Sequence, residues 1–157
     1  MTFMKDLEYS RASASNPVWE QIYRSAFPGF LSMQDCSHVG IHQKRGIDRI
    51  VTLKNCKQLY IDEKIRRDHF PIPDVLGGYD VALEFVSVDT FDKPGWVCNP
   101  DIDCDYIAYA VSPIGKGVLL PVIQLQSAWA KHKQEWLSRY GKKSTKAERN
   151  NGYRTWF

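Results

Sequence analysis

The sequence predicts an α/β domain in which helices flank a mixed central β-sheet, and three observations lead to this prediction. Segments rich in β-branched residues recur between residues 46 and 122, which suits strands. An amphipathic helical pattern stands on either side of them, at 17–26 and 123–140. The length of 157 residues, with 43% hydrophobic and 13% aromatic side chains, is typical of one globular domain. We therefore expect one domain over residues 1–141 and a basic tail at 142–157.

A short helix is predicted near the start of the chain. Asn16 is a favourable cap and Pro17 suits the first helical position, so the helix would continue from there to the break at residues 27–29. Residues 29–44 have mixed polarity and predict a loop or an irregular excursion. One apolar stripe of the helix contains Val18, Ile22 and Ala26.

Three strands are predicted next. Residues 46–53 alternate in polarity and are rich in β-branched side chains, and 59–66 follow after the polar connection at 54–58. A third strand is predicted at 80–88, after a loop rich in proline and glycine. Successive side chains of a strand point to opposite faces, so the second strand should present two different surfaces. One surface would hold Ile61, Glu63 and Ile65, and the other Tyr60, Asp62, Lys64 and Arg66.

The second half of the chain predicts two further strands and a long helix. Residues 89–105 are acidic and form a long connection, which is more typical of a functional excursion than of structureless filler. Strands are expected at 105–112 and 117–122, joined by a short turn. A helix over 123–140 should then end at Gly141.

The formal charge of +3 is unevenly distributed. Residues 131–157 contain eight Lys or Arg and two Glu, net +6, so the other residues carry 13 basic and 16 acidic side chains, net −3. A basic end on a mildly acidic body fits a protein that contacts polyanions and holds cations, although a solvated helix and tail would have the same composition. The candidates for contact with nucleic acid are Lys131, Lys133, Lys142, Lys143 and Arg149, with Trp96 as a side chain that could instead pack over the sheet.

The cysteines and the first residues of the chain predict its compartment. The four cysteines form no CxxC pair, which argues against a zinc ribbon. The first ten residues do not form a charged-then-apolar leader, and no apolar run approaches the length of about 18 residues that a bilayer requires. We therefore expect a cytoplasmic protein with free thiols and no membrane contact. The sequence leaves the oligomeric state open, a dimer included.

One group of residues has the composition that phosphodiester hydrolysis needs. Such a reaction requires an activated water and neutralised charge on the phosphoryl group, which bound Mg²⁺ can supply through one or two protein carboxylates. Asp48 and Asp62 lie on two strands that are expected to be neighbours, so their carboxylates can converge at one end of the sheet. Lys64 projects from the same face as Asp62, about 6–7 Å along the strand. Bringing two carboxylates together without a cation would be costly, and a metal ion would explain the pair.

These residues resemble a known family. Asp48, a 13-residue gap and Asp62-x-Lys64, within a helix-strand-strand-strand framework over residues 16–88, resemble the restriction-endonuclease-like PD-(D/E)XK nuclease superfamily. The resemblance implies a restriction-endonuclease-like core, with Asp48 and Asp62 as ligands of Mg²⁺ or Mn²⁺ and Lys64 assisting the water. It also implies Glu20, on the first helix, as a fourth member. Gly46-Ile47 stands before Asp48 where the motif's name places proline, and the wider sequence is also similar to small phage-encoded proteins.

Several of these carboxylates have a second interpretation. An alternating Asp-Glu-Lys strand also occurs on solvated antiparallel faces, where cross-strand charges pair weakly. Glu20 lies four residues before Arg24, which is the spacing of a surface helix pair. Glu84 lies in an almost wholly apolar strand segment and is either a further metal ligand and water-orienting carboxylate or a salt-bridged structural residue.

The sequence therefore predicts a metal-dependent nuclease that cuts DNA, with RNA as the alternative substrate. Its catalytic candidates are Asp48, Asp62, Lys64 and Glu84, and its metal-ligand candidates are Asp48, Asp62, Glu84 and Glu20. A protein without catalytic activity on the same fold, which binds nucleic acid or another protein, is the main alternative. A structural or inhibitory phage protein is a third.

Overall fold

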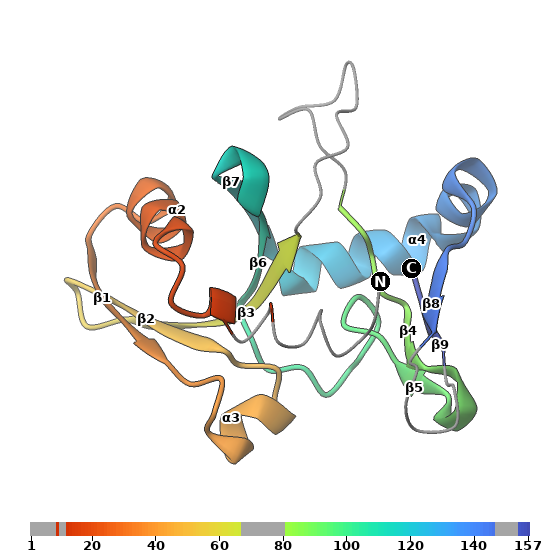
Figure 1. The fold of residues 1–157 in the computed structure, drawn as a ribbon, viewed down its shortest axis with the longest axis horizontal. Helices are drawn as coiled ribbons and strands as arrows, with labels where there is room; N and C mark the ends of the chain where they lie inside the picture. The colour runs from red at the N-terminus through yellow and green to blue at the C-terminus, as the bar shows by residue number, and fades with distance from the viewer. Residues whose placement is uncertain (1–8, 10–11, 67–80, 147–153) are drawn as a thin grey trace. The chain divides into compact units, whose positions relative to one another are not determined.

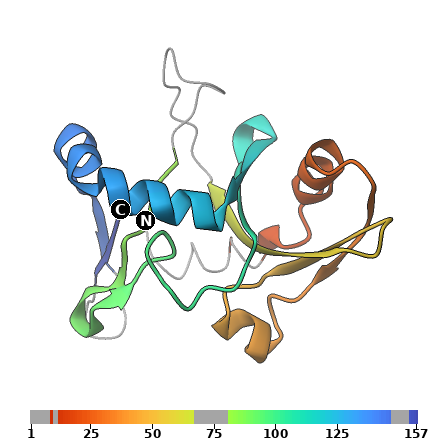
Figure 2. The same cartoon turned by 180° about the vertical axis from the view of Figure 1, so that it is seen from behind.

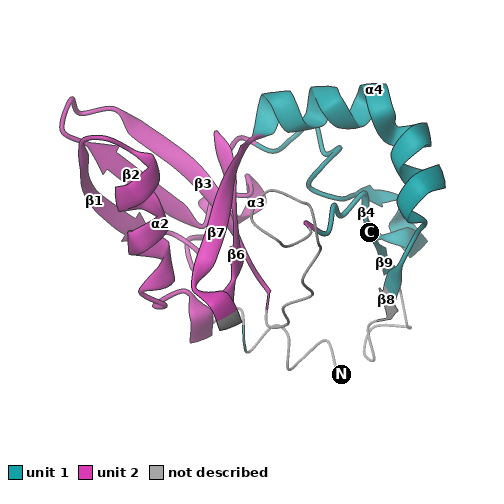
Figure 3. Ribbon diagram, turned by 90° about the horizontal axis from the view of Figure 1, so that it is seen from above, with its two compact units in different colours: residues 1–9, 82–102, 122–157 teal, residues 10–81, 103–121 magenta. Residues whose placement is uncertain are grey.

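The computed structural model describes residues 9, 12–66, 81–146 and 154–157. The chain divides into two compact units, which Figure 3 distinguishes by colour. Within the described ranges, no helix is long and apolar enough to cross a bilayer. Unit 1 consists of Met1–Tyr9, Ala82–Ile102 and Val122–Phe157, and unit 2 of Ser10–Val81 and Asp103–Pro121.

Unit 2 is built on a mixed β-sheet, as the sequence predicts (Figure 1). In the described residues the sheet has five strands in the order β1-β2-β3-β6-β7. The first three form an antiparallel meander, β6 runs parallel to β3, and β7 returns antiparallel to β6. Their bounds are Phe30–Asp35 for β1, Arg49–Leu53 for β2, Gln58–Arg66 for β3, Tyr106–Val111 for β6 and Lys116–Pro121 for β7.

Helix α2 (Val18–Ala26) covers one face of this sheet. Burial of each aliphatic side chain contributes about 1.5–3 kcal/mol, so apolar packing holds the helix in place. Gly117 of β7 allows a close approach, because a Cβ there would lie 2.5 Å from Cδ1 of Ile22 and 2.8 Å from the carbonyl oxygen of Tyr109. The buried cluster contains Val18, Trp19, Ile22 and Tyr23 of α2 with Phe30, Val51, Leu59, Ile61, Ala108 and Ala110 of the strands.

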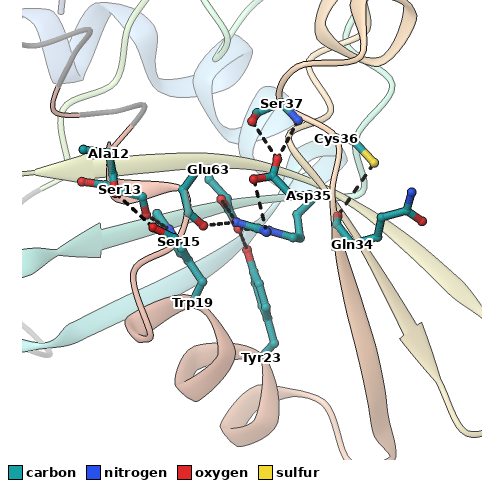
Figure 4. A network of polar contacts seen from close by, with 12 residues as sticks. Ala12, Ser13, Ser15, Trp19, Tyr23, Gln34, Asp35, Cys36, Ser37 and Glu63 are labelled. Atoms are coloured by element: carbon teal, nitrogen blue, oxygen red, sulfur yellow. Dashed lines mark hydrogen bonds and ion pairs between the residues drawn. The ribbon is translucent and has the colours of Figure 1, made fainter.

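A buried polar network lies on this same face of the sheet. Nε and Nη2 of Arg49 donate to the two carboxylate oxygens of Glu63, each at 2.9 Å, and both side chains are less than a tenth exposed. The Tyr23 hydroxyl donates to Glu63 at 2.5 Å, and Figure 4 shows the Tyr23 ring rising from α2 toward the network. Nη2 of Arg49 also donates to the carbonyl oxygen of Ala14 at 2.6 Å. The network therefore connects α2, the segment before it, β2 and β3.

Unit 1 contains the remaining strands and the long helix α4 (Val122–Tyr140). Its described strands form a second sheet in the order β5-β4-β9-β8. Phe85, just before β4, stacks on Trp129 of α4 with ring centroids 5.6 Å apart. A Cβ on Gly95 would collide with the backbone carbonyl of Glu84, so these two segments pack closely. The bounds are Val86–Val88 for β4, Lys93–Pro94 for β5, Ser144–Lys146 for β8 and Arg154–Trp156 for β9.

Most of the predicted elements are confirmed. Strands occur where residues 46–53, 59–66, 105–112 and 117–122 predict them, and the long helix spans the predicted range. Among the described residues, 3₁₀ turns occur at η1 (Asp89–Phe91) and η2 (Ser112–Ile114), of which the second joins β6 to β7. The boundary predicted at residue 141 stays a prediction, and beyond it the chain forms β8 and β9.

Two predictions about elements are wrong. The range 29–44 is not a loop, because it contains β1 and the short helix α3 (Gly40–Lys44). The range 80–88 is not a third strand of the main sheet. Its described residues are a strand only at 86–88, and that strand pairs with β5 and β9 in unit 1. Apolar content alone predicted it, and composition does not say which sheet a strand joins.

The Arg49–Glu63 pair should be strongly coupled in stability. Arg49→Met leaves the Glu63 carboxylate buried without its cation, so we expect it to lower the free energy of unfolding by about 3–5 kcal/mol. The double variant Arg49→Met/Glu63→Met should cost clearly less than the sum of the two single variants. Urea denaturation measures all three.

The matched control is Arg24→Met. Arg24 pairs with Glu20 on the surface of α2, where its side chain is 58% exposed, and this variant should cost less than about 1 kcal/mol. Additive costs for Arg49 and Glu63 would contradict the coupling.

Candidate functional site

The site begins with Asp48, which immediately precedes β2. Its backbone N–H donates to the carbonyl oxygen of Ile61 at 2.9 Å, and its own carbonyl oxygen accepts from the backbone of Cys36 at 2.7 Å. Its side chain reaches β3, where Oδ2 accepts the backbone N–H of Glu63 at 2.9 Å. Two of these three hydrogen bonds hold the half-buried Asp48 against the middle of β3, and one of the two is made by its carboxylate.

Asp62 and Lys64 lie on the face of β3 that points away from α2. Nζ of Lys64 donates to Oδ1 of Asp62 at 2.6 Å. Asp62 is buried, whereas the Lys64 side chain is 35% exposed and so connects the buried carboxylate to solvent. Glu63 takes the opposite face with Arg49 and Tyr23, as the alternation of the strand predicts.

The carboxyl groups of Asp48 and Asp62 converge, as predicted from the sequence. Burial raises the pKa of Asp62 to about 7. The Lys64 cation opposes this shift, while the charge of Asp48 and a hydrogen bond that the two carboxyl groups share add to it. When both groups are ionised, the two carboxylates repel one another, and a cation that reaches them is favoured.

Cys104 is a neighbour of this cluster that no pattern in the sequence singled out. Burial raises the pKa of its thiol to about 12, and the charge of Asp62 adds to that rise. Near neutral pH the Cys104 thiol is therefore protonated, so it is a poor nucleophile beside Asp62. The signal that could have found it is its place just before β6, because β6 pairs in parallel with β3 beginning at Ile61.

The other acidic residues near β6 have separate partners. Asp103 accepts from Nε of Arg45 at 2.7 Å, in a pair whose side chains are about half exposed. Oδ2 of Asp105 accepts the backbone N–H of Tyr60 at 2.8 Å. These contacts hold the loop that leads into β6. They engage the carboxylates of Asp103 and Asp105 with their own partners, whereas the carboxyl groups of Asp48 and Asp62 approach each other.

Of the other two predicted members of the site, one has a partner on its own helix and one belongs to the other unit. Glu20 accepts from Nε of Arg24 at 2.8 Å on the surface of α2, so the surface-pair interpretation of this residue is confirmed. Glu84 belongs to unit 1, where it precedes β4 in an irregular segment. Its role as a metal ligand or water-orienting carboxylate stays a prediction.

The candidates for nucleic-acid contact fall into three groups. Trp96 is 7% exposed, so the packing interpretation is confirmed and the ring is not available to stack on a base. Arg149 lies outside the described residues. The four lysines that were predicted to contact nucleic acid are all exposed in unit 1, at positions Lys131, Lys133, Lys142 and Lys143.

The donor set fits a divalent cation of the Mg²⁺ type. Mg²⁺ prefers hard oxygen ligands and usually takes one or two carboxylates, with waters and substrate phosphate as its other ligands. Asp48 and Asp62 supply two carboxylates whose mutual repulsion such an ion would relieve. No group of three or more His, Cys, Asp or Glu side chains is arranged to hold a metal within the described part of the chain.

Comparison of the chain with known proteins found no related sequence or structure. No family model matches the chain, and neither a curated protein nor a solved structure does.

The raised pKa of Asp62 predicts a pH-dependent stability in metal-free protein. Between about pH 4 and pH 7 the native state keeps a proton on Asp62 that the unfolded chain has lost, so the free energy of unfolding should fall as pH rises through this window. Asp62→Asn removes this fall and should be more stable than the wild type above pH 7, by roughly 1–3 kcal/mol. Thermal and urea denaturation in EDTA over this pH range measures the effect, and parallel curves for the two proteins would refute it.

Proposed function

We propose that the chain is a metal-dependent nuclease that hydrolyses phosphodiester bonds of DNA, with its site at Asp48, Asp62 and Lys64. The observation that carries the proposal is the convergence of the two carboxyl groups beside one lysine on a single face of the sheet. Glu63, between the two motif residues, faces the other way and belongs to the structural network.

Each residue of the site has a distinct part in this proposal. Asp48 and Asp62 would hold one Mg²⁺ or Mn²⁺, which when bound would activate water and neutralise phosphoryl charge. Asp48 is positioned by its hydrogen bond to β3, and Asp62 by burial in the sheet. Lys64, which reaches solvent, can offer its ammonium group to a phosphoryl oxygen or orient a water.

The order of elements supports the resemblance to the PD-(D/E)XK superfamily in a corrected form. A helix followed by three strands is present in unit 2, but the strands are β1, β2 and β3, and the range 80–88 is not among them. Asp48 and Asp62 thus stand before the second strand and within the third strand of the meander. The mixed sheet and the helix on one of its faces agree with part of the architecture that the resemblance implies, which has a helix on each side of the sheet.

One observation favours the alternative of a binding protein without catalytic activity. Lys64 already neutralises Asp62 through a direct contact at 2.6 Å, so the cluster can be stable without a metal ion. In that case the three residues would be a buried ion pair with an additional acid, and nucleic-acid contact would not require them.

A cleavage assay separates the two functions. Single-stranded, duplex and branched DNA, together with RNA, are incubated with the protein in Mg²⁺, Mn²⁺ or EDTA. We expect cleavage that requires a metal ion, and a fall in rate of at least about 100-fold for Asp62→Asn or Asp48→Asn, because each substitution removes an ion ligand worth several kcal/mol. Lys64→Gln should lower the rate while metal binding, followed by calorimetry, persists.

Asp103→Asn is the matched control. This acid lies in the same unit and makes only a surface pair, so its substitution should leave the rate unchanged. Metal-dependent cleavage that survives Asp62→Asn would refute the assignment of the site. Absence of cleavage on every substrate, together with salt-sensitive binding, would establish the alternative.

A further inference from the structure

The last two turns of α4 carry aromatic and basic side chains on one side. Residues three and four apart on a helix lie on the same side, which brings positions 132, 133, 136, 139 and 140 within an arc of roughly 120°. We call these residues, with the two lysines that follow Gly141, the α4 stripe. It consists of His132, Lys133, Trp136, Arg139, Tyr140, Lys142 and Lys143.

The rings of the α4 stripe run from the interior of unit 1 to solvent. Trp129, which is buried, lies 6.2 Å from Trp136, and His132 stacks on Trp136 with 5.7 Å between centroids. Tyr140 is 69% exposed at the end of the series, with the Arg139 guanidinium 5.4 Å from its ring centroid. Packing thus fixes the inner rings and leaves the outermost ring open to a ligand.

The charge around these rings is strongly positive. Between residues 122 and 146 the sequence has six Lys or Arg and one acid, Glu135. The Glu135 carboxylate already accepts from the His132 ring at 3.1 Å. Nζ of Lys133 lies 6.0 Å from the ring centroid of Trp129, so cations and rings alternate along the stripe. Lys142 and Lys143 follow Gly141, just before β8 begins at Ser144. Figure 2 shows the chain turning back after α4.

We propose that the α4 stripe binds single-stranded nucleic acid. An unpaired base can stack on Tyr140, while the flanking phosphates contact Arg139 and the lysines after the helix. A duplex cannot use the ring in this way, because its bases are already stacked inside. The α4 stripe and the proposed nuclease site would both act on nucleic acid. Binding at the stripe does not depend on cleavage, because the stripe lies in unit 1 and the cluster of Asp48 and Asp62 in unit 2.

Two other polyanionic partners fit the stripe less well. An acidic peptide would pair with the basic side chains, but it has no base that would stack on the exposed ring of Tyr140 beside Arg139. An anionic membrane surface would favour aliphatic side chains beside Tyr140, and the exposed aliphatic residue of this helix, Ile123, lies about 25 Å away at its other end.

Binding is measured by fluorescence anisotropy in EDTA, with the Asp62→Asn protein so that cleavage does not interfere. The probes are labelled oligothymidylate and oligouridylate of about 20 nucleotides, a duplex of the same length, and vesicles with anionic lipid. We expect the single strands to bind more tightly than the duplex. Tyr140→Ala should weaken single-strand binding about 5- to 100-fold and duplex binding much less.

The cations are tested by the salt dependence of binding. Replacing Arg139, Lys142 and Lys143 together by Gln should reduce the slope of log affinity against log salt by about 2 for a single strand. Lys131→Gln is the matched control for charge, because Lys131 lies about 140° around the helix from Trp136. It should change the affinity less than Lys133→Gln does.

Phe91→Ala is the matched control for the ring. Phe91 is 81% exposed in unit 1 but lies between Asp89 and Asp92, so its removal should leave affinity unchanged. The proposal is overturned if Tyr140→Ala and Phe91→Ala behave alike, if the duplex binds as tightly as the single strands, or if only the vesicles bind. Loss of nuclease activity in any variant has no bearing on these outcomes.

Discussion

The bidentate ion pair between Arg49 and Glu63 determines how the two central strands of unit 2 present their side chains. It joins β2 to β3 on the face covered by α2, and Tyr23 extends it into that helix. Successive residues of a strand alternate between faces, so Glu63 on this side requires Asp62 and Lys64 on the other. A shift of one residue in register would bury Lys64 under α2 and expose Ile61, which costs far more than any contact it could gain.

This division of β3 gives the protein two polar clusters with different properties. Under α2 the Arg49 guanidinium meets both carboxylate oxygens of Glu63 and a phenol donates to one of them, which opposes the rise that burial causes in the pKa of Glu63. On the other face Lys64 contacts Asp62, and burial, together with the nearby charge of Asp48, raises the pKa of Asp62 to about 7. The first cluster stabilises the fold, whereas the second retains an unmatched negative charge that a cation can neutralise. That contrast is why we propose Asp48 and Asp62 as the functional site.

Local alternation let the sequence predict β2, β3 and the separation of Glu63 from Asp62. It failed for β1, where Phe30 alone is buried and the other residues are half-buried or exposed, as expected for an edge strand. It also failed at 80–88, because apolar composition does not reveal that β4 pairs with β5 and β9. Cys104 and the acceptor role of Asp48 toward Glu63 depend on pairings between distant segments, which no local pattern contains.

The most direct test of the account is paramagnetic broadening of the protein's NMR signals by Mn²⁺. If Asp48 and Asp62 share a cation, low Mn²⁺ concentrations should broaden the amide signals of these residues, Lys64 and Cys104 first. The signals of Val18–Ala26, across the sheet, should remain sharper, and Mg²⁺ should reverse the effect by competition. Broadening that begins elsewhere, or that persists unchanged in the Asp48→Asn/Asp62→Asn protein, would contradict the account.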